Sequence, residues 1–536
     1  MIDKSQRIVR ELVPLEQIEM LQGKQIDFRN IAEMLVVRAR ETPDSPLAYY
    51  YDQVITYAQV NRRANRVAHF LKKQGVDRGD IVSTMVLNAP EIFYTMFGTQ
   101  KLGAVAGAIN YMLKGPEIAY VLDDSKPKVV FVGSDYMADF AAGLAKARHK
   151  PVVVEVVTDV THQADIAQYT LAAILAEYPD EECLVDQAPD DPTMLLYSSG
   201  TTGMPKGILI SHRNELSICK GKAVLGVHRP GDVMMILLPM FHTNPLCVWT
   251  YPSIYLGMSV CIRSRFSPAD FWPAIQQFGV TVVQGVPAMY DYIFQAADPA
   301  VIDREKLTLR LAYTGAAPMP IPLMDAFKEK FDVQVIDGYG LTEATGVSTT
   351  NTNLPRVAGA IGAAFPGLEV EIMDGDNNIL PYGEKGEICV RGEAVMLGYL
   401  NKPEATAESL RDGWLHTGDI GYMNEQGYVF ISGRLKEMIN RGGENIYPRE
   451  IEIPLEKHPK IAEVAVVGVP DAALGERVRA CVILKQPGTM TADELRDYLG
   501  DKLAKYKIPE IVDFMETFPR NPTGKILKQQ LKRNHS

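Results

Sequence analysis

The amino-acid sequence predicts an α/β protein. We expect a large N-terminal domain of layered α/β sheets with a small β subdomain, and a mobile small α+β C-terminal domain. Through the first 340 or so residues, short apolar runs alternate with amphipathic helical runs, which is typical of layered α/β architecture. Short β segments separated by glycine turns follow at residues 369–397. After residue 434 the pattern is helix, strand, strand, helix. We therefore expect two domains, residues 1–434 and 435–536.

Individual elements of both domains can be placed from periodicity and from start signals. In the large domain we expect helices at residues 61–74 and 90–103, and strands at 81–87, 128–132, 151–157, 309–313 and 333–336. Pro320 and Pro322 open a further helix, because proline is favourable in a first helical turn. In the small domain we expect helices at 449–458 and 492–504 and strands at 462–469 and 478–484. Thr491 and Glu494 form a capping box for the last helix.

Composition excludes several classes of protein. The chain has 536 residues, of which 46% are hydrophobic and 23% charged, as in ordinary globular proteins. A formal charge of −11 argues against non-specific binding to nucleic acid or to anionic membranes. The apolar region at 233–262 is interrupted by three prolines, so it reads as buried core bordering a cavity, and we expect no integral membrane segment. The six cysteines are scattered without metal-like spacing. We expect free thiols and a cytoplasmic protein, with a homodimer as a possible assembly.

The segment YSSGTTGMPKG at residues 197–207 lies between two strand-like runs. Glycines let the backbone approach a ligand closely, and successive N–H groups form a cradle for anions. Pro205 precedes Lys206, and Gly207 begins a β-like run, so the segment is not a Walker loop. The loop alone is equally compatible with a flexible turn. The candidate phosphate-binding residues are Ser198, Ser199, Gly200, Thr201, Thr202, Gly203 and Lys206.

Four further segments carry chemically useful side chains. DGYGLTE at 337–343 follows a strand and is therefore expected at the carboxyl edge of a sheet, where α/β proteins bind ligands. GWLHTGD at 413–419 offers a carboxylate that can accept from ribose hydroxyls. Residues 433–445 combine charges with paired glycines, as in a mobile joint, and residues 519–525 present one lysine on a rigid turn. Taken singly, these are also ordinary turns, a linker and a solvated tail.

Together and in this order, the five segments closely resemble the adenylate-forming, or AMP-binding, superfamily, which includes the acyl-CoA synthetases. The resemblance extends from about residue 29 to 532. The form of residues 443–448 is similar to that of acyl-CoA and aryl-CoA ligases. The resemblance to the superfamily implies an AMP-forming acyl-CoA synthetase whose large domain binds ATP and the acyl group. ATP, Mg²⁺, coenzyme A and a small carboxylic acid would be its ligands.

The resemblance also implies roles for particular residues. The loop residues named above would hold the β- and γ-phosphates of ATP, with Thr202 and Glu343 at Mg²⁺. The adenine would lie along Gly315, Ala316, Ala317 and Pro318 and against Asp337, Gly338, Tyr339 and Gly340. Thr342 would contact the α-phosphate, Asp419 and Arg434 the ribose, and His242 the acyl carboxylate. Lys436 matches the hinge and Lys525 the lysine essential for adenylation. Gly442, Gly443 and Glu444 match the loop that faces coenzyme A.

The substrate acid is restricted but not identified by the sequence. Residues 239–244 contain no acidic side chain to pair with an ammonium group, so an α-amino acid is not expected. The predicted acyl pocket, which consists of residues 241–250, 284–289, 313–315 and 338–347, is largely apolar, with Gln284, Thr345 and Asn244 as isolated polar groups. This favours an aliphatic, alicyclic or aromatic acid of modest size. Transfer to a carrier-protein thiol and a non-catalytic ATP- or acyl-binding module are the alternatives. The presence of both Glu343 and Lys525 argues against the second of these.

Overall fold

The structure is a computed structural model of the whole chain. It describes residues 4–8, 10–23, 25–157, 166–198, 205–229, 231–298, 302–317, 319–441, 444–471, 474–500, 502–520 and 526–533. The chain divides into two compact units. The larger consists of Arg7–Val370 and Val390–Leu415, and the smaller of Met1–Gln6, Glu371–Cys389 and His416–Ser536. The domain boundary at residue 434 remains a prediction.

The first sheet of the larger unit has the strand order β16-β15-β14-β13-β12-β10-β11-β1-β2. The strands from β14 through β12 and β10 to β1 run parallel, and antiparallel strands close both edges. Their bounds are β1 (Pro46–Tyr50), β2 (Gln53–Thr56), β10 (Val233–Ile236), β11 (Ser259–Ile262), β12 (Val282–Gly285), β13 (Leu311–Thr314), β14 (Gln334–Tyr339), β15 (Thr349–Thr350) and β16 (Ala363–Ala364).

The second sheet of the larger unit has the order β19-β9-β8-β4-β3-β5-β6-β7. Strand β5 near its centre, VVFVG, is a continuous apolar run and is fully buried, as expected for a parallel strand covered by helices. The bounds are β3 (Ile81–Met85), β4 (Val105–Ala108), β5 (Val129–Gly133), β6 (Val152–Val156), β7 (Tyr169–Thr170), β8 (Pro192–Ser198), β9 (Lys206–Ser211) and β19 (Gly398–Tyr399). The short strand β20 (Leu410–Arg411) belongs to the same unit.

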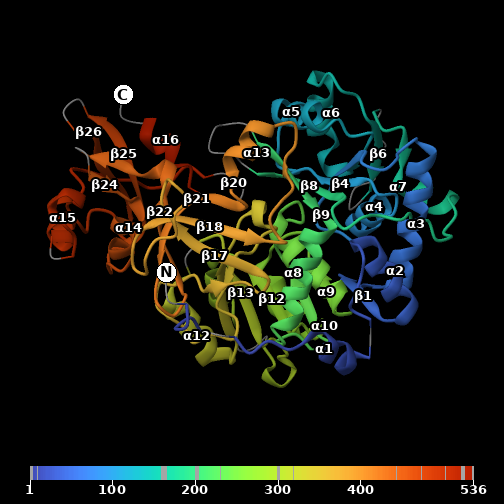
Figure 1. The fold of residues 1–536 in the computed structure, drawn as a ribbon, viewed down its shortest axis with the longest axis horizontal. Helices are drawn as coiled ribbons and strands as arrows, with labels where there is room; N and C mark the ends of the chain where they lie inside the picture. The colour runs from blue at the N-terminus through green and yellow to red at the C-terminus, as the bar shows by residue number, and fades with distance from the viewer. Residues whose placement is uncertain are drawn as a thin grey trace. The chain divides into compact units, whose positions relative to one another are not determined.

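Helices cover these sheets. Helix α3 packs against α4 and α7, and α8 packs against α9 (Figure 1). The helices are α1 (Leu15–Gln22), α2 (Ile31–Glu41), α3 (Tyr57–Lys73), α4 (Glu91–Gln100), α5 (Gly115–Ser125), α6 (Met137–Lys146), α7 (Leu171–Glu177), α8 (His212–Val224), α9 (Tyr251–Tyr255), α10 (Pro268–Phe278), α11 (Pro287–Gln295), α12 (Ile321–Phe331) and α13 (Pro403–Ser409). One core cluster joins side chains of β10, β12 and β13 to those of α10, α11 and α12.

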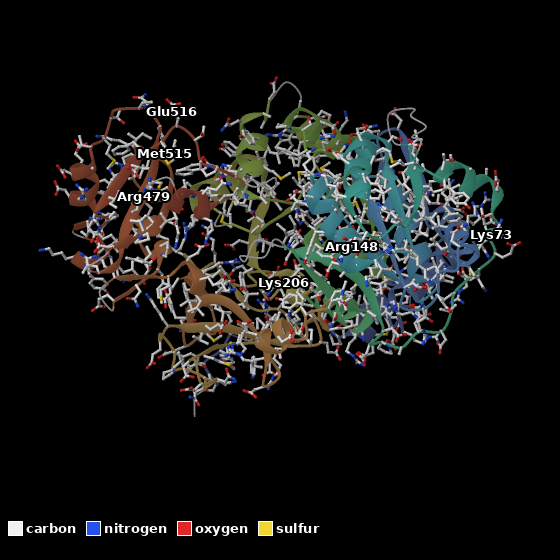
Figure 2. The ribbon with its side chains drawn as sticks, turned by 90° about the horizontal axis from the view of Figure 1, so that it is seen from above. Lys73, Arg148, Lys206, Arg479, Met515 and Glu516 are labelled. Atoms are coloured by element: carbon white, nitrogen blue, oxygen red, sulfur yellow. The ribbon has the colours of Figure 1, made fainter. Side chains whose placement is uncertain are left out.

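The smaller unit is α+β. Three strands lie partly in this unit and partly in the larger one: β17 (Leu368–Met373), β18 (Gly386–Gly392) and β21 (Trp414–Met423). The strands that lie wholly in the smaller unit are β22 (Val429–Arg434), β23 (Ile439–Arg441), β24 (Glu444–Ile446), β25 (Ile461–Asp471), β26 (Gly475–Leu484) and β27 (Ile511–Phe514). Its helices are α14 (Pro448–Glu456), α15 (Ala492–Gly500) and α16 (Lys528–Arg533). Arg479, labelled in Figure 2, lies on β26 and donates from Nη1 to the carbonyl of Leu531 at 2.6 Å, which ties α16 to the sheet.

Most of the predicted elements are confirmed, with small differences at their ends. The Thr491–Glu494 capping box is present, with reciprocal bonds of 2.8 and 3.2 Å. The helix that it begins is shorter than predicted, because it ends at Gly500 and residues 502–504 are not helical. Glycine has a low helix propensity and ends this helix early. All six cysteines are free, as expected. Residues 233–262 are core, and no described helix has the length and apolarity needed to cross a bilayer.

Candidate active site

The two strands predicted on either side of the glycine-rich loop are confirmed. Strands β8 and β9 pair antiparallel, and Ser198 lies opposite Lys206 at their open end. Lys206, labelled in Figure 2, is the first residue of β9. The rest of the predicted phosphate-binding loop lies outside the described residues: Ser199, Gly200, Thr201, Thr202 and Gly203. Their role as an anion cradle therefore remains a prediction, although the strand ends that would present them are in place.

A tyrosine that the sequence analysis missed connects Lys206 with Glu343. Strand β19 pairs with β9 and places Tyr399 opposite Ile208. Lys206 Nζ lies 4.5 Å from the centre of the Tyr399 ring, and the Tyr399 hydroxyl donates to Glu343 Oε1 at 2.9 Å. Burial and then the Glu343 charge raise the pKa of Tyr399, so its hydroxyl stays protonated and donates. The lysine predicted to bind phosphate and the carboxylate predicted to bind the metal ion thus lie in one cluster.

Thr342 and His242 approach the same region from different elements. Thr342 begins a 3-10 turn (Thr342–Ala344), and Thr243 donates from Oγ1 to Thr342 Oγ1 at 3.0 Å. His242 precedes Thr243, and its ring centre lies 4.3 Å from that of Phe241. Burial lowers the pKa of His242 to about 4, so the imidazole is neutral at pH 7. It can hydrogen-bond to a carboxylate, but it brings no positive charge.

The segment after β14 is shaped by close backbone approaches. Strands β13 and β14 are parallel with Thr314 opposite Asp337, and a Cβ on Gly315 would lie 3.3 Å from the carbonyl oxygen of Gly338. A Cβ on Gly340 would lie 2.4 Å from the carbonyl oxygen of Gly346, so only glycine fits there. These approaches hold Tyr339, the last residue of β14, at the carboxyl end of the sheet.

Asp337 and the turn after β13 complete this edge. Asn351 donates from Nδ2 to Asp337 Oδ1 at 2.6 Å, while burial raises the pKa of Asp337. After β13, Ala316 adopts a left-handed conformation with φ of 65° and, like Ala317, is exposed. Pro318 lies outside the described residues. The two segments predicted to line the adenine are therefore neighbours at one sheet edge.

The predicted acyl pocket contains a π-helix that the sequence did not indicate. Residues Asn244–Thr250 form this helix, η2, which begins directly after Thr243. π-Helical turns are rare and are frequent at functional sites. Thr345, predicted as a polar group of the pocket, is buried and donates from Oγ1 to the Ala394 carbonyl at 2.6 Å. Its hydroxyl is therefore already used within the protein.

The smaller unit brings together the residues predicted to bind ribose. Asp419 on β21 and Arg434 on β22 are register partners, and Arg434 Nε lies 2.8 Å from Asp419 Oδ1. Lys436 is exposed in the following 3-10 turn, Leu435–Glu437. Glu444 begins β24 opposite Arg441 and is exposed. Three predicted site residues of this unit lie outside the described residues: Gly442, Gly443 and Lys525.

A second cluster in the smaller unit could not be seen in the sequence. Glu387 and Cys389 on β18 meet His416 on β21, with His416 Nδ1 2.8 Å from Glu387 Oε2 and 3.5 Å from Cys389 Sγ. These atoms, all within 4.8 Å of one another, could ligate a metal ion. Strand pairing brings them together across 27 residues of sequence, so spacing along the chain gives no signal.

Comparison with known proteins identifies the family. The AMP-binding enzyme family matches residues 35–400, and the AMP-binding enzyme C-terminal domain family matches residues 450–525. The chain belongs to the AMP-binding enzymes. Within this superfamily it is an AMP-forming acyl- or aryl-CoA ligase family enzyme.

Relatives of this AMP-binding enzyme match it over nearly its whole length. A long-chain-fatty-acid–CoA ligase of Mycobacterium tuberculosis is 35% identical over 515 residues, covering 95% of this chain and 99% of its own. A feruloyl-CoA synthase of Amycolatopsis is 35% identical over 500 residues, covering 93% and 97%. The ATP-bound structure of MatB from Rhodopseudomonas palustris superposes with a TM-score of 0.84 at 31% identity, covering 94% and 98%. The fold and the family are thereby established.

Proposed function

We propose that this enzyme is an acid–CoA ligase. It converts a carboxylic acid of modest size into an acyl-AMP and then an acyl-CoA, releasing pyrophosphate and AMP. The observation that carries the proposal is the cluster of Lys206, Tyr399 and Glu343, with Thr342 beside it at the carboxyl edge of the β14 sheet. A fixed cation, a carboxylate and a hydroxyl at one edge match the needs of a polyphosphate with its metal ion.

In the first step the carboxylate of the acid attacks the α-phosphorus of ATP, and the bond to pyrophosphate breaks. Two anions must approach, so the site has to neutralise charge as it moves onto the leaving group. Lys206 contributes a positive charge, and Thr342 contributes a hydroxyl. Neutral His242 orients the attacking carboxylate through a hydrogen bond and forms no ion pair with it. In this proposal Asp419 and Arg434 bind the ribose, and Lys525 bridges carboxylate and α-phosphate, as the resemblance implies.

Glu343 fits a magnesium site by the chemistry of its donor atoms. Mg²⁺ prefers oxygen ligands and is commonly bound by one or two carboxylates together with substrate phosphates. Glu343 has Oε1 held by the Tyr399 hydroxyl, which fixes the orientation of the whole carboxylate. Bound there with Thr202, the ion would stabilise the charge that develops on pyrophosphate.

In the second step the coenzyme A thiol attacks the acyl carbonyl and AMP leaves. Lys525 has no role once acyl-AMP exists. We propose that the small domain then turns about Lys436, so that Gly442 and Gly443 admit the pantetheine arm, with Glu444 beside them. Glycines leave room for the arm to pass close to the backbone.

The relatives are named for very different acids, so their names do not identify the substrate of this enzyme. They include a sulfoacetate–CoA ligase of Cupriavidus necator, 33% identical, and a fatty acid–[acyl-carrier-protein] ligase of Streptomyces coeruleorubidus, 34% identical. The second name supports a carrier-protein thiol as the alternative acceptor. Incubation with ATP, Mg²⁺ and a panel of acids, with either coenzyme A or a pantetheinylated carrier protein, tests both. We expect AMP, pyrophosphate and an acyl-CoA; ADP and orthophosphate as products would refute the proposed reaction.

A further inference from the structure

A buried lysine lies in the wall of the predicted acyl pocket. Lys222, in the last turn of α8, is only 4% exposed. Its Nζ lies 3.6 Å from the ring centre of Trp249 and 4.7 Å from that of Tyr313. Trp249 belongs to the π-helix η2, and Tyr313 to β13. Three elements of the larger unit therefore meet at this ammonium group.

In the part of the chain that the structure describes, no carboxylate pairs with Lys222. Burial is the sole cause that lowers its pKa, to about 7, and no anion raises it. Lysines are almost never fully buried unless paired, because removing an ammonium from water is strongly unfavourable. Contact with two aromatic faces compensates only in part. A buried amine with no anion beside it is suited to bind an anionic group that arrives with a ligand.

Neighbouring polar groups are also left without partners among the described residues. Gln284 is 2% exposed, and neither its side-chain oxygen nor its nitrogen makes a hydrogen bond. It lies beside Tyr313 in the β12–β13 register. His228 has a buried Nδ1 without a partner, and its ring centre lies 6.0 Å from that of Trp249. Buried polar side chains are normally hydrogen-bonded, so this concentration points to a polar ligand group.

The same wall reaches the reacting end of the site. The π-helix that carries Trp249 follows Thr243 directly, and Thr243 is hydrogen-bonded to Thr342. A Cβ on Gly346 would lie 2.6 Å from Val248 Cγ2, so the turn after Thr342 packs tightly on this helix. Thr342 and Lys222 therefore contact successive parts of one segment, residues 243–249. An acid lying along this segment would have its two ends at these two residues.

We propose that the substrate carries a second anionic group, distal to the reacting carboxylate, and that Lys222 pairs with it while Gln284 donates a hydrogen bond. The substrate class is thus an α,ω-dicarboxylic acid or a carboxylic acid with a distal sulfonate. This inference rests on the proposed function. The aromatic rings of Trp249 and Tyr313 exclude water around the pair and give the acyl chain an apolar path.

Matched acids test the inference. The probes are the C4 to C8 straight-chain diacids, the monoacids of equal length, ω-sulfonates of the same lengths, and the pair benzoate and terephthalate. Each is assayed with ATP and Mg²⁺ for pyrophosphate release. We expect the wild type to prefer a diacid or sulfonate over its matched monoacid by about 30-fold or more in kcat/KM, because a buried charge pair is lost with the monoacid. The carboxylate and sulfonate arms distinguish the two distal groups.

Variants assign the preference to Lys222. Lys222→Met removes the charge at similar length and should abolish the preference while keeping activity on monoacids. Lys222→Gln is a second variant, which retains a donor. Lys220→Met is the matched control on the same helix, because Lys220 is partly exposed and should leave the preference unchanged. The inference alone would be overturned if the wild type accepted monoacids and refused all dianions. It would also be overturned if Lys222→Met lowered kcat/KM equally for the diacid and for the matched monoacid. No pyrophosphate from any acid would overturn the proposed function as well.

Discussion

Replacing Lys222 with methionine is expected to stabilise the ligand-free enzyme. A pKa lowered from 10.5 to about 7 means that the charged form is less favourable in the folded protein by about 5 kcal/mol. The contact with the Trp249 ring offsets roughly 2 kcal/mol of this. Lys222→Met should therefore raise the free energy of unfolding by about 3 kcal/mol near pH 7. Thermal unfolding followed by calorimetry or circular dichroism should show the melting temperature of the larger unit rise by several degrees.

The pH dependence of this difference gives the prediction its sign. The folded-state pKa of Lys222 lies below the unfolded value, so the unfolded chain binds more protons between about pH 7 and 10.5, and wild-type stability rises with pH in this window. The advantage of Lys222→Met should be full below pH 7 and decline as the pH approaches 10.5. His228 does not contribute to this pH dependence, because burial and the nearby Lys222 lower its pKa to about 3, and its ring stays neutral in the pH range measured.

If Lys222→Met were less stable than the wild type across pH 6–9.5, the predicted cost of burying this lysine would be refuted. That outcome would mean that Lys222 is already paired in the ligand-free protein. Lys220→Met serves again as the control and should change stability little, since substitutions of partly exposed side chains usually have small effects. Adding a diacid with ATP should narrow the difference, because the diacid binds the wild type more tightly than the variant and so stabilises the wild type more.

Three further predictions concern the reaction. Glu343→Gln should lower the rate of pyrophosphate release by about 10²-fold or more and weaken its dependence on Mg²⁺, whereas Tyr399→Phe, which only loosens the carboxylate, should cost less; equal losses would contradict the orienting role of Tyr399. Lys525→Ala should lose adenylation yet make thioester from preformed acyl-AMP, and Gly443→Leu should do the reverse; if both half-reactions fall together in either variant, the domain-rotation proposal fails. Free α-amino acids should not drive pyrophosphate exchange, and saturable exchange at low concentration would show that the pocket holds an ammonium group.

The local signals were predictable because they depend on neighbours in sequence. Short continuous apolar runs predict β8 and β9, and the small and charged residues between 197 and 207 indicate a loop. The Thr491–Glu494 box spans a single helical turn, so it can be read from the chain and is confirmed. The ends of elements are less predictable. The helical pattern continues to residue 504, but the low helix propensity of glycine ends this helix at Gly500.

Side chains brought together by strand pairing were not predictable. Tyr399 reaches Glu343 because β19 pairs with β9, across 56 residues of sequence. The cluster of Glu387, Cys389 and His416 forms across β18 and β21. Nothing in the spacing of these residues gives a signal, since the distance along the chain says nothing about register between distant strands.

The sequence by itself determined the layered α/β class, the phosphate-loop strands and the family, because periodicity, turn residues and ordered motifs are properties of the linear chain. Only the tertiary structure decided which polar side chains in and around the predicted acyl pocket already have partners. It ties Thr345 to a backbone carbonyl and buries Lys222 against Trp249 and Tyr313 without an anion among the described residues. A lysine in a helix reads as a solvated charge until packing shows which face of that helix is buried. Desolvation, which makes Lys222 a candidate for recognising a second anionic group, exists only in the folded protein.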